Sequence, residues 1–241
     1  MGARDQHGSG APWGDDFRAV GKSLRKIEGL SKATGEAVYA DDIVLPGMLH
    51  AKTLRSPHAH ARIVSIDASK ALALEGVHAV ITGADLPTKY GVIPWTKDEN
   101  ALAVDKVRFI GDEVAAVAAV DEDTANAAVR LIEVEYEELY SYFEPEESLE
   151  RHEPAIHEKN KHGNVSKHVE LDFGDVDGAQ ESADLVVEGS YRFHGSTHAA
   201  IEPHCAVARV AADGVLTLWS ATQISHYVHR ALARVLEWEP Q

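Results

Sequence analysis

Fourteen histidines and a single cysteine give this chain several side-chain groups that could bind a metal ion. His58 and His60 stand two residues apart, so both imidazoles would face one side of an extended strand and could supply two ligands to zinc or copper. No third ligand follows at a fixed spacing, and a loop or strand-edge pair is the alternative interpretation. Two further groups are candidate metal ligands: His198 with His204 and Cys205, and His226 with His229.

Cys205 is the only thiol, and as a nucleophile it would need an activating base and an electropositive site. His204 is adjacent in the chain, and adjacent side chains of a strand point to opposite faces. The glycines are scattered, with no Gly-x-Gly-x-x-Gly or Walker loop to hold the phosphates of a nucleotide. Paired carboxylates such as Asp41 and Asp42 are expected by chance among 39 acidic residues. The residues alone therefore assign no catalytic residue and no metal ligand.

One glutamine stands at a junction where it could serve a site. Gln223 follows an apolar strand expected over Val215–Ser220 and precedes a helix expected over Ser225–Leu236. A glutamine amide donates a hydrogen bond without bringing charge and without titrating, which suits a position beside a metal centre. The alternative is structural, because an amide at the end of a strand can also satisfy the N-terminus of the next helix.

Composition limits the classes of function. A chain of 241 residues that is 44% hydrophobic can bury a sizeable core. Its formal charge of −16 argues against a surface for nucleic acid or anionic membrane, because phosphates would be repelled. One cysteine excludes an internal disulfide and an iron–sulfur cluster bound within the chain, since a cluster needs about four thiolates. No stretch approaches the length of a membrane span, and the polar N-terminus has no apolar core for a signal peptide, so we expect a cytoplasmic protein.

Short strands and helices alternate along the chain, which predicts an α+β fold. The predicted strands of the first region are Gly47–Leu54, Ala61–Ile66, Val77–Thr82, Glu113–Val120 and Ile132–Leu139. Glu113–Val120 is apolar on both faces, as in a strand that is buried on both sides. Asp67 can cap a helix that runs to Leu74, and Asp121 or Asp123 can cap a helix over Thr124–Leu131.

The pattern divides the chain into four segments. Residues 1–18 are Gly-rich and polar and predict a disordered lead-in, residues 19–143 form the first domain, and residues 144–164 are a charged, Pro-broken linker. Residues 165–241 begin a second domain, whose expected elements are a short helix at Gly174–Ala183, strands at Leu185–Phe193, Ala206–Val210 and Val215–Ser220, and the final helix. Asp213 and Gly214 are a good hairpin turn between the last two strands.

A series of motifs occurs in a fixed order along these segments. They are Gly29-x5-Gly35-x3-Tyr39-x-Asp41-Asp42, Leu54-Arg55-Ser56-Pro57-His58-Ala59-His60-Ala61, Gly76-Val77-x-Ala79-Val80-x-Thr82, Val107 through Ala118, Glu133 through Leu139, Gly174-Asp175-Val176 through Asp184, Glu188-Gly189-Ser190-Tyr191, and Glu202-x-His204-Cys205. This order resembles the large subunit of the xanthine dehydrogenase and aldehyde oxidase family of molybdenum hydroxylases. The resemblance implies that residues 19–143 form an α/β hammerhead domain and that residues 165–241 are the first, incomplete part of a molybdopterin-binding domain.

The resemblance also implies a cofactor and partners. A molybdenum–molybdopterin centre would move electrons to or from an organic substrate, and iron–sulfur and FAD subunits or domains would carry them onward in a hetero-oligomer. Gln223 would donate its amide hydrogen bond toward an oxygen ligand of the molybdenum. Within the family, Tyr90–Pro94 and Tyr227–His229 are similar to the α subunit of 4-hydroxybenzoyl-CoA reductase.

The family's next Gly-Gly-x-Gly-Gly segment, its later arginine and its catalytic glutamate have no counterpart here. We therefore expect the N-terminal portion of a large subunit, which needs the remainder of that subunit, from further chain or another polypeptide, for activity. Two other classes of function stay open at this point. One is a noncatalytic interaction module that docks electron-transfer subunits, and the other is a small metal-binding protein that uses the histidine groups.

Overall fold

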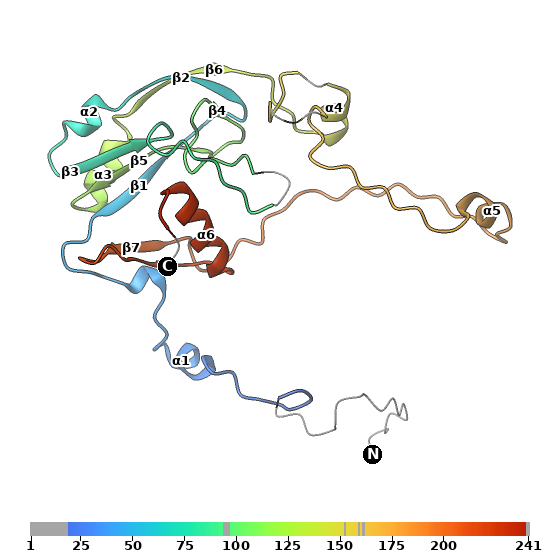
Figure 1. The fold of residues 1–241 in the computed structure, drawn as a ribbon, viewed down its shortest axis with the longest axis horizontal. Helices are drawn as coiled ribbons and strands as arrows, with labels where there is room; N and C mark the ends of the chain where they lie inside the picture. Colours follow the sequence, from blue (N-terminus) through green and yellow to red (C-terminus); the bar gives the residue numbers. More distant parts are fainter. Residues whose placement is uncertain (1–18, 94–96, 152, 159, 161, 240–241) are drawn as a thin grey trace. The chain divides into compact units, whose positions relative to one another are not determined.

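The computed structural model describes residues 19–239 except 94–96, 152, 159 and 161 (Figure 1). The chain divides into two units, the first assigned to Met1–Ile43 with Glu202–Ala221 and the second to Val44–Ile201 with Thr222–Gln241. The elements in chain order are α1 (Gly29–Thr34), the 3-10 helix η1 (Ala40–Asp42), β1 (His50–Arg55), β2 (Ala61–Asp67), α2 (Ser69–Leu72), β3 (Val77–Thr82), β4 (Lys106–Val107), β5 (Glu113–Ala119), α3 (Glu122–Val129), β6 (Glu133–Glu138), α4 (Pro145–Glu150), α5 (Val176–Glu181), β7 (Ala206–Val210), β8 (Leu216–Ser220) and α6 (Ser225–Val235). This mixture of helices and antiparallel sheets confirms the predicted α+β class.

The second unit contains two three-stranded sheets. The first has the order β1-β5-β3, with β5 antiparallel to both neighbours. Because β5 is central, its apolar side chains are covered on both faces, and Val114, Ala115 and Val117 are buried. The prediction of a strand buried on both sides is therefore confirmed.

The second sheet has the order β4-β2-β6 and is also antiparallel. Ala61 begins β2 and pairs with Val107 of β4 on one side and with Glu138 of β6 on the other. Ala61, Ala103, Val107 and Val114 form one small core, while a second core gathers around Val117, Ala128 and Ile132. The two-residue strand β4 was not predicted, because so short a strand carries no alternating pattern.

Helix α3 packs on the first sheet, against β1 and β5. Asp121 caps it, since its carboxylate accepts a hydrogen bond of 2.7 Å from the Thr124 N–H, and the predicted cap is confirmed. Asp67 likewise accepts a hydrogen bond of 2.9 Å from the Ser69 N–H at the start of the one-turn helix α2. Helix α6 belongs to the same unit, and two hydrogen bonds connect its C-terminal end with residues 88 and 89. Thr88 Oγ1 donates to Glu237 Oε1, just after the helix, at 2.7 Å, and Arg234 Nε donates to the Lys89 carbonyl at 2.6 Å.

The first unit contains the β7–β8 hairpin, with Ala206 paired to Ser220 and Val210 paired to Leu216. Gly214 lies in the turn with a φ of 84°, which a glycine adopts without strain, and Asp213 accepts a hydrogen bond from the Val215 N–H. This is the predicted hairpin turn. Helix α1 and η1 belong to the same unit, and η1 contacts β7.

Two sequence predictions are corrected by the structure. Leu185–Phe193 is not a strand: residues 166–204 are exposed throughout apart from Gly178, and their only regular element is α5. A strand needs a neighbour to satisfy its backbone groups, and no described segment pairs with this one. The expected linker contains helix α4, which begins with Pro145 at a position where proline is favoured. The predicted disordered lead-in, residues 1–18, lies outside the described residues.

Candidate functional site

Gln223 lies in the stretch of chain that leads from β8 to α6, and its side chain is exposed. Thr222, the residue before it, accepts a hydrogen bond of 3.4 Å from the Ile224 N–H through its Oγ1. This contact bends the chain locally, as threonine hydroxyls often do in turns. Helix α6 then begins at Ser225 without a side-chain cap, so Gln223 is not used as the cap of this helix. Its amide remains on the surface, where it can donate to a neighbouring group.

The histidine and cysteine groups lie in unlike surroundings. The His58 ring lies 4.8 Å from the Tyr136 ring, centroid to centroid, in a tilted contact, and its Nδ1 lies 3.5 Å from Glu138, whereas His60 is buried with 3% of its surface exposed. Burial raises the pKa of the Cys205 thiol, and the nearby Asp41 carboxylate raises it further, so a thiolate nucleophile is disfavoured. His198, His204, His226 and His229 are exposed. Among the described residues, no three His, Cys, Asp or Glu side chains gather as a metal site.

A buried charge cluster that the sequence did not reveal lies beside β4. Lys106 is 3% exposed, and its ammonium donates to the Ala155 carbonyl at 2.6 Å and pairs with Glu158. Arg108 donates from Nε to the Ile156 carbonyl at 3.0 Å, and its Nη2 lies 3.5 Å from Glu158. Partial burial opposes ionisation of Glu158, but the hydrogen bond from Lys106 and the two cations outweigh it and lower the pKa of the carboxyl to about 2. The cluster therefore holds residues 155–158 against β4.

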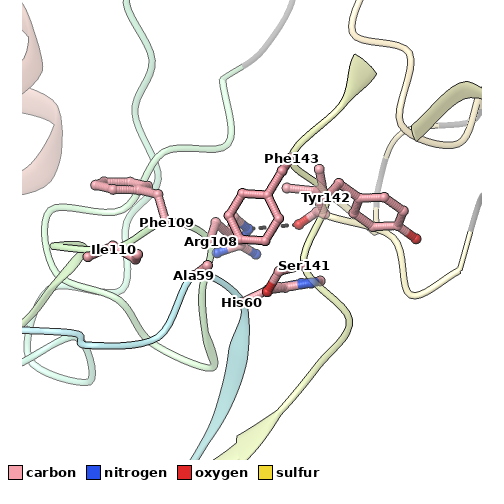
Figure 2. Close-up of a pocket in the computed structure, with 9 residues that line it drawn as sticks. Ala59, His60, Arg108, Phe109, Ile110, Ser141, Tyr142 and Phe143 are labelled. Atoms are coloured by element: carbon pink, nitrogen blue, oxygen red, sulfur yellow. Dashed lines mark hydrogen bonds between the residues drawn. The ribbon is translucent and has the colours of Figure 1, made fainter. Parts of the chain in front are cut away.

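A pocket of about 260 Å³ opens next to this cluster (Figure 2). Figure 2 shows Phe143 in front of Arg108, with Phe109 and Ile110 to one side and the Tyr142 ring turned away on the other. The lining residues are Ala59, His60, Arg108, Phe109, Ile110, Ser141, Tyr142, Phe143 and Ile156. They come from the turn before β2, the loop after β4 and the chain after β6, so a local sequence motif could not have predicted the pocket.

His60 makes one strong contact in the wall of this pocket. Its Nδ1 donates to the Tyr140 carbonyl at 2.7 Å, because a carbonyl can only accept. Burial lowers the pKa of His60 and outweighs the hydrogen bond to the Tyr140 carbonyl, which raises it, and Lys106 and Arg108 lower the pKa further, which favours the neutral ring. Its Nε2 is buried and has no hydrogen-bond partner among the described residues.

Comparison with known proteins places the chain in a family. Residues 34–140 match the family described as "Aldehyde oxidase and xanthine dehydrogenase, a/b hammerhead domain", and residues 156–241 match "Molybdopterin cofactor-binding domain". The chain belongs to the aldehyde oxidase and xanthine dehydrogenase family. The two matched segments cover the described second unit and the β7–β8 hairpin almost completely, which agrees with the predicted hammerhead followed by a molybdopterin-binding region.

Curated relatives of the chain are named as subunits of dehydrogenases, and the name of one of them specifies molybdopterin. The large molybdopterin subunit of nicotinate dehydrogenase from Eubacterium barkeri is 42% identical over 92% of this chain and 52% of its own length. The large chain of carbon monoxide dehydrogenase from Afipia carboxidovorans is 33% identical over 92% of this chain and 29% of its own. The chain thus spans about half or less of the length of these relatives.

Solved structures in the family share the fold. Quinoline 2-oxidoreductase from Pseudomonas putida 86 superposes with a TM-score of 0.79 at 35% identity, over 89% of this chain and 28% of that one. The aldehyde oxidoreductase of Desulfovibrio gigas superposes with a TM-score of 0.77 at 29% identity, over 89% of this chain and 25% of that one. In the part of the chain that is described, no helix has the length and apolar character needed to cross a membrane.

Proposed function

We propose that this chain serves as part of the large subunit of a molybdenum-cofactor oxidoreductase, in which Gln223 donates a side-chain hydrogen bond to the bound cofactor. The supporting observation is that residues 156–241, which contain Gln223, match a molybdopterin-binding family. The bound molybdenum centre would supply the exchange of electrons with an organic substrate.

The local structure fits this role. Gln223 offers an uncharged amide donor that is exposed and is not consumed as a helix cap. Because the amide does not titrate, its hydrogen bond would be constant across the pH range in which the enzyme works. The chain's own contribution is therefore to orient one neutral donor at the start of α6, and further chain would supply the remaining contacts to the cofactor.

The partners form part of the proposal. Iron–sulfur and FAD subunits or domains would accept the electrons, and the remainder of the large subunit would complete the cofactor site. The exposed apolar side chains on residues 165–201 favour contact with further polypeptide, because large apolar groups are rarely left in water over so long a stretch. They are Val169, Leu171, Phe173, Val176, Leu185, Val186, Val187, Tyr191, Phe193 and Ile201. The same feature favours the second candidate, a noncatalytic module that docks electron-transfer subunits.

The finer assignment to a 4-hydroxybenzoyl-CoA reductase-like subunit rests on Tyr90–Pro94 and Tyr227–His229. Pro94 lies outside the described residues, and the relatives named above do not bear that activity. We retain it as a proposal that an assay for phenolic dehydroxylation in the assembled enzyme would test.

The experiment compares Gln223→Ala with Gln180→Ala in the enzyme complex isolated from its source. Gln180 is exposed on α5 and serves as the control. Because residues that tune a metal from beyond its ligands typically contribute 10–100-fold, we expect turnover or molybdenum content to fall by about tenfold or more in the Gln223 variant only. Equal behaviour of the two variants would refute a role for Gln223 at the cofactor.

A further inference from the structure

We propose that the pocket beside Arg108 binds a small aromatic carboxylate, with the carboxylate on the guanidinium and the ring beside Phe109 and Phe143. The site lies in the second unit, in the region matched to the hammerhead domain and the chain that follows it. It is separate from Gln223 and does not depend on the proposed function.

Charge is the first observation. Among the described residues that line the pocket, Arg108 is the only one with a permanent charge, although the chain as a whole carries a formal charge of −16. Burial and the neighbouring cations lower the pKa of His60, which favours its neutral form. Glu158 lies outside this lining and pairs with both Lys106 and Arg108, so this cluster of two cations and one acid keeps a net positive charge beside the pocket, which favours an anion of small size.

The second observation is that Arg108 is held in place but keeps hydrogen-bonding capacity. Its Nε donates to the Ile156 carbonyl at 3.0 Å, and its Nη1 donates to the Lys106 carbonyl at 3.1 Å. Its Nη2 has only the 3.5 Å ion pair with Glu158. The two strong bonds fix the plane of the guanidinium, and the remaining N–H groups suit the two oxygens of a carboxylate.

The third observation is that exposed apolar side chains line the pocket. Phe109 is 55% exposed and Phe143 is 76% exposed, and both stand at the pocket with Ile110, which is 67% exposed (Figure 2). Rings on these walls can stack on a flat aromatic ligand, which would remove apolar surface from water on both sides. A volume of about 260 Å³ accommodates a ligand with one ring.

His60 supplies a fourth observation. It is 3% exposed, lines the pocket, and has an Nε2 atom without a partner among the described residues. Buried polar atoms are almost always hydrogen-bonded, so an atom in a pocket wall that has no partner among the described residues is available to a polar group of a ligand. A substituent on the ring of the ligand, or a water molecule bound with the ligand, would form the missing hydrogen bond with His60 Nε2.

The test is a calorimetric titration of the full chain with benzoate at pH 7. Benzamide, which is neutral and of the same shape, and acetate, which has no ring, are the comparison ligands. We expect a saturable site with a Kd of about 1 mM or lower for benzoate, and at least about fivefold weaker binding of both comparison ligands, in line with the strength of charged hydrogen bonds and of ring contacts.

Two variants decide which residues carry the binding. Phe143→Ala should weaken benzoate binding about fivefold or more, whereas Phe173→Ala, which removes a ring of matched exposure at 78%, should leave it unchanged. Arg108→Gln should abolish the preference for benzoate over benzamide. If Arg108→Gln does not fold, the Phe143→Ala variant and the comparison of benzoate with benzamide still test whether the pocket binds an aromatic carboxylate. Absence of saturable binding, equal affinity for benzoate and benzamide, or equal effects of the two phenylalanine variants would overturn the proposal.

Discussion

Neutralising Glu158 should destabilise the second unit, because it leaves a buried cation without its counter-ion. Lys106 is 3% exposed and has two partners, the Ala155 carbonyl and the Glu158 carboxylate. In the Glu158→Gln variant, the ammonium keeps the carbonyl and gains at most a neutral amide oxygen. A buried charge that loses its partner retains its desolvation penalty, so the folded state loses free energy relative to the unfolded state.

The pKa of Glu158 gives the size of the effect. A depression from 4.5 to about 2 would correspond to about 3 kcal/mol for a buried group, at 1.36 kcal/mol per unit. The Glu158 side chain is 57% exposed, so solvent screening reduces the expected loss to about 1–2 kcal/mol at pH 7. Because the folded pKa is lowered, this stabilisation is complete above pH 4.5 and is lost as the pH falls toward 2.

The assay is urea denaturation followed by circular dichroism at pH 7 and at pH 2.5. The control is Glu137→Gln, which removes an exposed pair in which Arg62 Nε lies 3.6 Å from Glu137 and both side chains are 63% exposed. We expect the control to change the free energy of unfolding by less than about 0.5 kcal/mol at pH 7. At pH 2.5 the Glu158 variant should approach the wild type. Equal losses in both variants at pH 7, or a Glu158 effect that persists unchanged at pH 2.5, would refute the reasoning.

Three further predictions concern the frame of the second unit, and each is measured by urea or thermal denaturation. Val117→Ala should cost about 1–3 kcal/mol, because the side chain is fully buried in the core and leaves a cavity; a loss below about 0.5 kcal/mol would contradict this packing. Asp121→Ala should cost about 1 kcal/mol through loss of the α3 cap, and Asp123→Ala, within the first turn of α3, should cost less; the reverse order would count against the cap. Gly83→Ala should destabilise strongly, since its Cβ would lie 2.4 Å from a backbone oxygen, whereas Gly195→Ala meets no atom within 4 Å and should be tolerated; similar melting temperatures would show the close approach to be wrong.

Several elements of the fold could be predicted from the sequence because their signals are local. The apolar run at Glu113–Val120, the capping Asp121 and the Asp213–Gly214 turn each act over a few residues, and each is found where expected. The predicted strand at Leu185–Phe193 was wrong because β-branched and aromatic content shows only that a segment could pair. Whether it pairs depends on a partner strand, which a local pattern does not reveal.

The candidate sites were predictable to different degrees. Gln223 was singled out by the order of motifs around it, and its role at a cofactor remains a prediction. His58 and His60 looked equivalent in sequence, but the half-buried His58 ring contacts Tyr136, whereas His60 is buried. The Arg108 pocket and the Lys106–Glu158 cluster could not be predicted, because they join residues about 50 positions apart through tertiary contacts.

The most direct test of the proposed function is native mass spectrometry with metal analysis of this chain purified from its source. We predict a larger complex that contains this chain together with molybdenum and with iron–sulfur and flavin-bearing polypeptide. A chain that is isolated without molybdenum and without such partners, under conditions that preserve related enzymes, would contradict the proposal that it serves in a molybdenum-cofactor oxidoreductase.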